Sequence, residues 1–371
     1  MSGKPFAVVA ATRTRGGFTL RQRGCASGFT LAELLVSVFV LTIIIFMVAQ
    51  LMTSATAVTR TGNKHIDTDT QARAVFDRMA VDFAQMLKRT DIDYYVKGPN
   101  GIYNGHGNGH GWGQRKQTGQ QGSDQLAFFS QVPGYYPSTG AQSPISLVTY
   151  RINENTGAGN PAYLKLERMG KGLLWNGVDN PNRQPNQSGY TSPIVFLPLL
   201  IKDIWPAASD GTTADPQSHY EIIGPGVFRF EYYYLIKNGR LDDWPWDKFA
   251  RTDQLTLTNP QSIGLTDIEA IVVAIAVIDP AARALINPAS LDDLASDMAD
   301  FRSAHGRGNG GTRNIGDLEA DWNGVLVGDP TRVPPEPGVI NTGLTSNSTP
   351  VPPEAAKAIR IYSKTFDLRT F

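Results

Sequence analysis

The sequence predicts an α+β protein in which a long N-terminal helix precedes an antiparallel sheet. The apolar stretch at residues 29–51 is long enough to span a bilayer as a helix. Apolar residues at three- and four-residue steps over 70–88 indicate an amphipathic helix. Short alternating or β-branched segments, separated by turn-forming clusters, then recur after residue 125. We expect four to seven antiparallel strands, on which the apolar face of the second helix packs.

The first 28 residues form a basic leader without an acidic side chain, and its charges are Lys4, Arg13, Arg15, Arg21 and Arg23. The positive-inside rule places this end in the cytoplasm and the rest of the chain outside. A secretory signal would have a shorter apolar region and a small-residue cleavage site after it. The single cysteine, Cys25, precedes the apolar stretch, whereas a lipoprotein signal has the opposite order. Without the leader the chain contains no thiol, so no disulfide or cysteine-based metal site is expected.

Glu33 is the only charged side chain between Arg23 and Arg60. A carboxylate costs about 2.5–3.5 kcal/mol at the centre of a membrane helix and less near its end. We therefore expect a partner for Glu33. A plain signal anchor explains the basic flank and the apolar span, but it gives no reason for this charge.

The helix predicted at 70–88 places its apolar residues on one face: Ala72, Val75, Phe76, Met79, Ala80, Phe83, Met86 and Leu87. Its charges are expected on the exposed face, namely Arg73, Asp77, Arg78, Asp82 and Lys88. The linking residues 53–61 are small and polar, and Gly62 offers a break between the two helices.

Strands are predicted at 126–132, 145–152, 163–168, 227–236, 268–278 and 358–366. Asn238-Gly239 predicts a hairpin turn after the fourth of these. Residues 97–122 read as a glycine-rich loop, in which His106 and His110 lack an acidic partner and so do not indicate a metal site. Residues 281–356, with helices expected at 290–304 and 315–326, are predicted to form a surface excursion.

The remaining polar residues form no catalytic pattern, since neither H-E-x-x-H nor G-x-S-x-G occurs. Isolated histidines and adjacent acids are predicted to be surface positions, although the acids could serve calcium: His219, His305, Asp242-Asp243 and Asp292-Asp293. The tyrosines at 232–234 alternate across a strand and are expected to pack. We predict no enzyme, no catalytic residue, no cofactor, no metal and no small-molecule substrate. The balance of 34 basic and 34 acidic side chains also argues against a nucleic-acid partner.

The run GFTLAELLV at 28–36, behind a basic leader, resembles the processing site of type IV prepilins and pseudopilins. The resemblance implies that a prepilin peptidase cuts after Gly28 and that the new amino terminus, Phe29, is N-methylated. It also implies that Glu33 pairs with the terminal amine of a neighbouring subunit during assembly. The implied fold is pilin-like, with a half-buried helix against an antiparallel sheet.

A weaker resemblance concerns the later chain. GVFRFEY at 226–232, the Asn-Gly turn, WPW at 244–246 and the strand from 268 look like J-type minor pseudopilins of type II secretion systems. FDRMAVD at 76–82 is similar to the helix that follows their membrane span. The tail RIYSKTFDL at 360–368 and the length are similar to the prepilin-like C protein of Verru_Chthon gene cassettes.

These inferences predict three parts: a leader at 1–28, a transmembrane and assembly helix at 29–62, and an extracytoplasmic domain at 63–371 with an insertion at about 281–356. The expected function is a minor pilin or pseudopilin subunit. It would sit in the inner membrane with its N-terminus cytoplasmic and its domain periplasmic, and it would contact the peptidase and other subunits. The alternative is a membrane-anchored extracytoplasmic binding or enzymatic domain.

Overall fold

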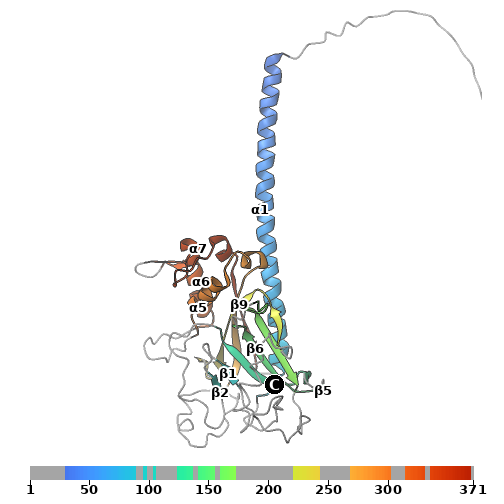
Figure 1. Ribbon diagram of the computed structural model, residues 1–371, viewed down its shortest axis with the longest axis vertical. Helices are drawn as coiled ribbons and strands as arrows, with labels where there is room; N and C mark the ends of the chain where they lie inside the picture. Colours follow the sequence, from blue (N-terminus) through green and yellow to red (C-terminus); the bar gives the residue numbers. More distant parts are fainter. Residues whose placement is uncertain are drawn as a thin grey trace, which may run out of the picture. The chain divides into compact units, whose positions relative to one another are not determined.

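The protein has an α+β fold. Its structure, a computed structural model, describes residues 30–88, 95–97, 103–105, 123–136, 141–154, 159–172, 220–242, 268–301, 314–330 and 335–368. The chain divides into two compact units, Met1–Thr59 and Arg60–Phe371. The second unit holds two main sheets and a group of short helices (Figure 1).

Helix α1 spans Leu31–Ala84. Gly62 therefore does not break the helix, contrary to the expectation from sequence. The preceding small polar stretch is helical too, and its threonine hydroxyls donate to carbonyls one turn back. Thr56 Oγ1 bonds the Met52 carbonyl at 2.6 Å, and Thr59 Oγ1 bonds the Ala55 carbonyl at 2.9 Å. Residues that favour a non-helical turn elsewhere are thus satisfied within the helix.

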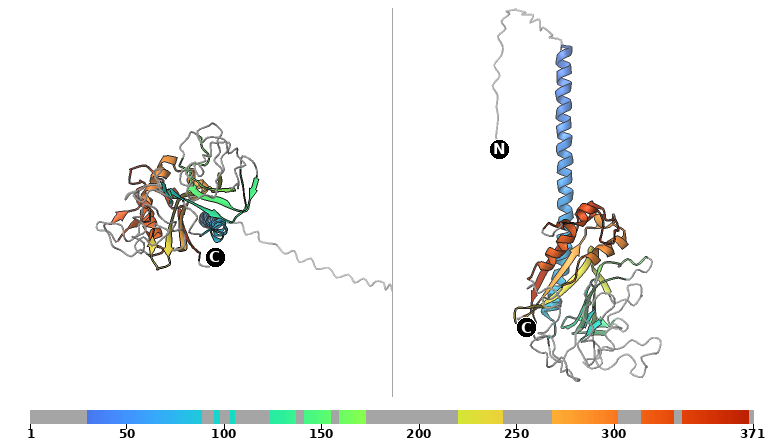
Figure 2. Two further views of the ribbon diagram at one scale, coloured as in Figure 1. Left: turned by 90° about the horizontal axis from the view of Figure 1, so that it is seen from below. Right: turned by 90° about the vertical axis from the view of Figure 1, so that its left-hand side faces the viewer.

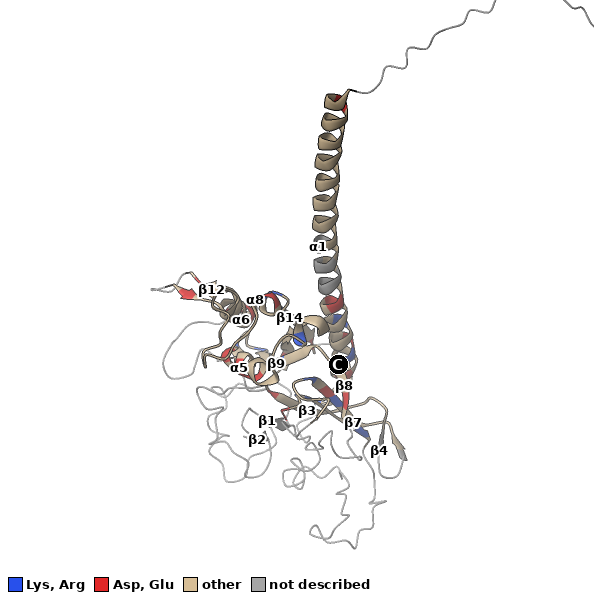
Figure 3. Cartoon of the chain, turned by 45° about the horizontal axis from the view of Figure 1, so that its top comes forward, with Lys and Arg blue, Asp and Glu red and all other residues tan. Residues whose placement is uncertain are grey.

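Within the first unit, Leu31–Thr56 is long and apolar enough to cross a bilayer, with a mean hydropathy of 2.8. Length and composition of this kind suit either a membrane anchor or a signal sequence. Figure 3 shows the first half of α1 without charged side chains, apart from its first turn. That one acidic position is Glu33.

Within the second unit, the apolar face of α1 packs into the core as the periodicity predicts. Val75 and Met79 are fully buried. The Phe83 ring centroid lies 5.2 Å from that of Phe128 and 4.9 Å from that of Phe366, which belong to different sheets. The helix therefore contacts both sheets through one aromatic side chain.

The larger sheet has the strand order β2-β1-β3-β6-β7-β4-β5, with β8 paired to β7. Its strands are β1 Tyr95–Lys97, β2 Tyr103–Gly105, β3 Gln125–Ser130, β4 Gly134–Tyr136, β5 Ala141–Ser143, β6 Ser146–Ile152, β7 Leu166–Gly172 and β8 Tyr220–Gly224. All pairs are antiparallel except that of β4 with β7, which are parallel. The strand predicted at 163–168 begins and ends later than expected, as β7.

The second sheet has the order β10-β9-β11-β14 and is antiparallel throughout. Its strands are β9 Val227–Ile236, β10 Leu241–Asp242, β11 Ile268–Val277 and β14 Arg360–Asp367. The predicted Asn-Gly turn joins β9 to β10, and Gly239 takes a φ of +81°, which glycine adopts without strain. The expectation of a single sheet is therefore wrong, because the strands divide between two.

Both faces of the second sheet are buried at β9 and β11, whereas most residues of β14 are half-buried or exposed. Side chains alternate across a strand, so Tyr232 and Tyr234 of β9 share one face and Tyr233 occupies the other. All three tyrosines are buried, which confirms that this run packs. A strand that is apolar on both sides, such as β11, needs a cover on each face.

The described residues of 280–356 supply one of these covers, so this part of the predicted surface excursion at 281–356 is packed against the core. They form α4 Pro280–Arg283, α5 Pro288–Asp297, α6 Asp317–Val327, β12 Gly328–Asp329, β13 Glu336–Pro337, α7 Val339–Thr342 and α8 Pro353–Ala356. Helix α5 contacts β9 and α6 contacts β14, and Figures 1 and 2 show the helices of this segment grouped together beside that sheet. Leu291, Leu294, Met298 and Trp322 are fully or almost fully buried there. The sequence signal for this packing is the set of apolar residues three and four positions apart on α5. The polar residues around them led to the prediction of a surface segment.

Candidate functional site

The start of α1 is the candidate site, because it contains the predicted processing and assembly residues. Gly28 and Phe29 lie outside the described residues. Glu33 lies in the first turn of α1, and Thr30 stands immediately before the helix.

Thr30 and Glu33 form a reciprocal hydrogen-bonded pair. Glu33 Oε2 accepts from the Thr30 backbone N–H at 3.0 Å and from Thr30 Oγ1 at 2.9 Å. The Glu33 backbone N–H in turn donates to Thr30 Oγ1 at 3.3 Å. This is the capping-box arrangement, in which a threonine before the helix and a glutamate three residues later satisfy each other's backbone groups. The expected partner of Glu33 is thus present in part within its own chain.

Sequence reasoning missed this pair, although the signal was present. Thr-Leu-Ala-Glu at 30–33 has the spacing S/T-x-x-E and stands directly before an apolar run. The capping box explains where the helix begins. It does not by itself explain why residue 33 is a charged glutamate, because an uncharged glutamine can serve at the same position of a capping box.

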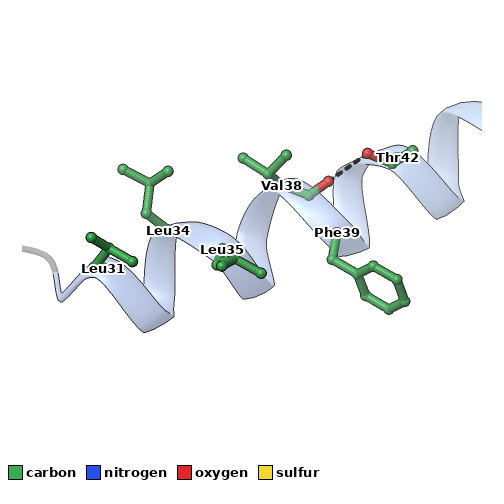
Figure 4. A pocket seen from close by; sticks show the side chains of 6 residues that line it. All are labelled: Leu31, Leu34, Leu35, Val38, Phe39 and Thr42. Atoms are coloured by element: carbon green, nitrogen blue, oxygen red, sulfur yellow. Dashed lines mark hydrogen bonds between the residues drawn. The ribbon is translucent and has the colours of Figure 1, made fainter.

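An apolar stripe follows the capping box along the helix. It is formed by side chains at helical spacing that project from the first three turns (Figure 4): Leu31, Leu34, Leu35, Val38, Phe39 and Thr42. Thr42 is the one polar member, and its Oγ1 donates to the Val38 carbonyl at 2.7 Å. Its hydroxyl is therefore satisfied within the helix, and the stripe presents an apolar surface to lipid or to another helix.

Two buried ionic clusters lie in the second unit. In the first, Asp82 of α1 is completely buried, which contradicts its predicted place on the exposed face. The Arg168 guanidinium of β7 binds it with two bonds, Nε to Oδ2 at 2.6 Å and Nη2 to Oδ1 at 3.0 Å. Tyr150 of β6 donates its hydroxyl to Oδ2. The cluster fastens α1 to the larger sheet.

The electrostatics of this cluster agree with its geometry. Burial raises the pKa of Tyr150 well above its ordinary value, and the neighbouring Asp82 carboxylate adds to the effect. Burial acts to lower the pKa of Arg168, but its bonds to Asp82 outweigh burial and raise it. Tyr150 therefore stays neutral and Arg168 stays charged near neutral pH, as a structural clamp requires.

The second cluster centres on Arg229 of β9, which is fully buried. Its Nη2 lies 2.6 Å from Asp300 Oδ1 and 3.3 Å from Glu231 Oε2, and its Nε donates to the Met298 carbonyl at 3.2 Å. The guanidinium also lies over the Trp322 ring, 5.4 Å from the centroid. Burial acts to lower the pKa of Arg229, but the carboxylates outweigh it and raise it. The cluster joins the second sheet to residues 280–356.

The other predicted polar positions add no further chemistry to the described part of the chain. His106, His110, His219, His305 and Asp243 lie outside it. Asp292 and Asp293 lie on α5, where Asp293 accepts from the Asn347 side-chain amide at 3.1 Å. Among the described residues, no three His, Cys, Asp or Glu side chains are grouped so that they could hold a metal ion.

The chain matches no protein-family model, and it has no significant match among curated proteins.

Proposed function

We propose that this protein is a minor pilin or pseudopilin subunit of a filament of the type IV pilus or type II secretion kind. The observation that carries the proposal is Glu33. It is the only charged side chain between Arg23 and Arg60, it lies within the apolar stretch at 29–51, and it stands five positions after a glycine that ends a basic leader.

The mechanism follows from the cost of burying charge. Burial of an unpaired α-ammonium group or an unpaired carboxylate in hydrocarbon is unfavourable. When the two are buried together, their attraction as an ion pair offsets much of the desolvation cost. Cleavage after Gly28 would create such an amine on Phe29. A subunit would then present its amine to the Glu33 of its neighbour, and the apolar stripe of α1 would line the contact between helices.

The fold is compatible with this role. A pilin-like arrangement needs one helix that continues from the membrane into a globular domain and packs there on an antiparallel sheet. Helix α1 has the required length, and the apolar face of its residues 72–83 packs on sheets. The proposed location is the inner membrane, with the N-terminus cytoplasmic and the α+β domain in the periplasm or on a surface filament.

Mass analysis of the amino terminus tests the processing step. The protein isolated from membranes of its own cells is expected to begin with N-methylated Phe29. An intact leader, or a start beyond Leu51, would contradict the proposal. It would favour a plain anchor or a cleaved signal sequence.

Substitution of Glu33 tests the assembly step. Glu33→Val should insert into the membrane at least as well as the wild type, because a charge penalty is removed. Glu33→Gln is the matched variant, since glutamine preserves the capping box and removes only the charge. Both variants should be cleaved after Gly28, and both should form several-fold fewer crosslinks to other prepilin-type subunits, with a measurable residual yield. Equal crosslinking by wild type and Glu33→Gln would show that the charge is no assembly contact.

A further inference from the structure

We infer that Thr30 is the positioning residue of the proposed assembly site, in that it holds the Glu33 carboxylate in one orientation with a single oxygen available. The inference rests on the proposed function, and it assigns a role that the processing motif does not require. Its basis is the distribution of hydrogen bonds over the two carboxylate oxygens.

Both Thr30 donors converge on the same oxygen. The Thr30 N–H and Oγ1 lie 3.0 and 2.9 Å from Glu33 Oε2, whereas Oε1 receives no hydrogen bond from any residue in the described part of the chain. Oε2 is therefore occupied within the chain. Oε1 is the acceptor that remains for an incoming cationic donor.

The third bond makes the arrangement rigid. Because the Glu33 N–H donates to Thr30 Oγ1 at 3.3 Å, the hydroxyl is fixed as an acceptor from the helix and as a donor to the carboxylate. A free glutamate side chain loses rotamer freedom when it is captured by a partner, and that loss weakens the contact. A glutamate already held by Thr30 has lost this freedom beforehand.

The apolar surroundings strengthen the effect. Water competes poorly for hydrogen bonds at the edge of the hydrocarbon, so a donor that loses its acceptor there is left unsatisfied. The side chains that follow, such as Leu31 and Leu34, are apolar and offer no substitute. Thr30 is therefore the one described residue that can orient the carboxylate.

The test compares five forms of the full chain in the membranes of its own cells: wild type, Thr30→Ser, Thr30→Val, Glu33→Gln and the double variant Thr30→Val/Glu33→Gln. The quantity measured is the crosslinked adduct with a second prepilin-type subunit, counted per chain that begins at Phe29. This normalisation removes any effect of the substitutions on cleavage.

Thr30→Val is nearly isosteric and removes only the hydroxyl. It should lower the adduct several-fold, within the roughly two- to thirty-fold range expected for one capping interaction. Thr30→Ser should give the wild-type yield, because serine keeps the hydroxyl that valine lacks. The double variant should yield as much adduct as Glu33→Gln alone, because without the charge there is nothing left to orient.

Three results would overturn the inference, and each differs from failure of the proposed function. Wild-type yield from Thr30→Val would show that orientation is unimportant. Failure of Thr30→Ser to restore the yield would assign the effect to side-chain shape. A double variant weaker than Glu33→Gln would show that Thr30 acts only through helix stability. Failure of the assembly proposal itself would instead appear as wild-type yield from Glu33→Gln.

Discussion

At the scale of single residues, the charges on α1 divide into two kinds that the sequence does not distinguish. Asp77 is exposed and lies 3.6 Å from Lys364, whereas Asp82 is completely buried against Arg168 and Tyr150. The periodicity predicted that both lie on the exposed face, because both are charged and fall between the apolar positions of the helix at 70–88. Only the arginine on β7, far away in sequence, determines that Asp82 turns inward.

The buried cluster of Asp82, Arg168 and Tyr150 predicts that removal of the Asp82 charge destabilises the protein far more than removal of the exposed Asp77 charge. Asp82→Asn leaves the Arg168 guanidinium buried without its counter-charge, which should lower the free energy of unfolding by about 3–5 kcal/mol. Asp77→Asn is the matched control at an exposed ion pair and should change it by less than about 1 kcal/mol. Urea unfolding of both variants measures the difference. Equal effects would mean that Asp82 is not desolvated in the native protein.

Glu167 of β7 predicts a pH dependence of stability. Burial raises the pKa of this carboxyl above its ordinary value, against the opposing effect of Arg151. A raised folded-state pKa contributes stability that is fully present below the unfolded value, about 4.3, and is lost as pH rises through the folded value. Relative to Glu167→Gln, the wild type should therefore gain stability as pH falls from 7 toward 4.5. A pH-independent difference between the two would contradict the prediction.

At the scale of elements, the sequence located the amphipathic helix and the longer strands except β8, but it missed the strands of two or three residues and did not show how the strands are grouped. β9 has the predicted bounds, and β11 differs by one residue, because each is a β-branched or aromatic run closed by turn residues. Their division into two sheets depends on pairings between distant segments, such as β11 with β14, which no local pattern encodes. The capping box can be predicted from the four residues 30–33 alone. The packing of 280–356 cannot, because it depends on the apolar sheet face that this segment covers.

That covering role predicts that α5 is part of the core. Leu294→Ala removes a completely buried side chain and should cost about 2–5 kcal/mol of unfolding free energy. Leu285→Ala, at a position that is more than half exposed, provides the control and should change it by less than about 0.5 kcal/mol. If both substitutions were equally mild, residues 280–356 would be the surface excursion after all.

Continuity of α1 predicts the effect of Gly62→Ala. No atom lies within 4 Å of the position that an added Cβ would occupy, and glycine within a helix is less favourable than alanine by about 0.5–1 kcal/mol. The substitution should therefore raise the thermal midpoint of the full chain in detergent and preserve its helical circular dichroism. A loss of helical signal would indicate the break that the sequence offered.

At the scale of the whole molecule, the division at Thr59 predicts that the second unit is an independent folding unit. A fragment starting at Arg60 lacks the apolar helix of Leu31–Thr56 and retains the described core of both sheets. It should be soluble and show a mixed helix and strand spectrum by circular dichroism, with cooperative unfolding. An aggregated fragment without strand signal would show that the core needs the first unit.

The position of β14 has a consequence for synthesis and export. This strand pairs with β11 along its whole length, and the Tyr362 hydroxyl bonds Thr68 of α1 across a separation of 294 residues. Contacts so distant in sequence make a fold slow to form. In the topology proposed above, the apolar half of α1 enters the bilayer early, but its second half cannot dock fully until β14 has been translated and exported. Until then the faces of β9 and β11 stay open to chaperones and proteases, so a chain truncated before residue 360 should be anchored and then degraded.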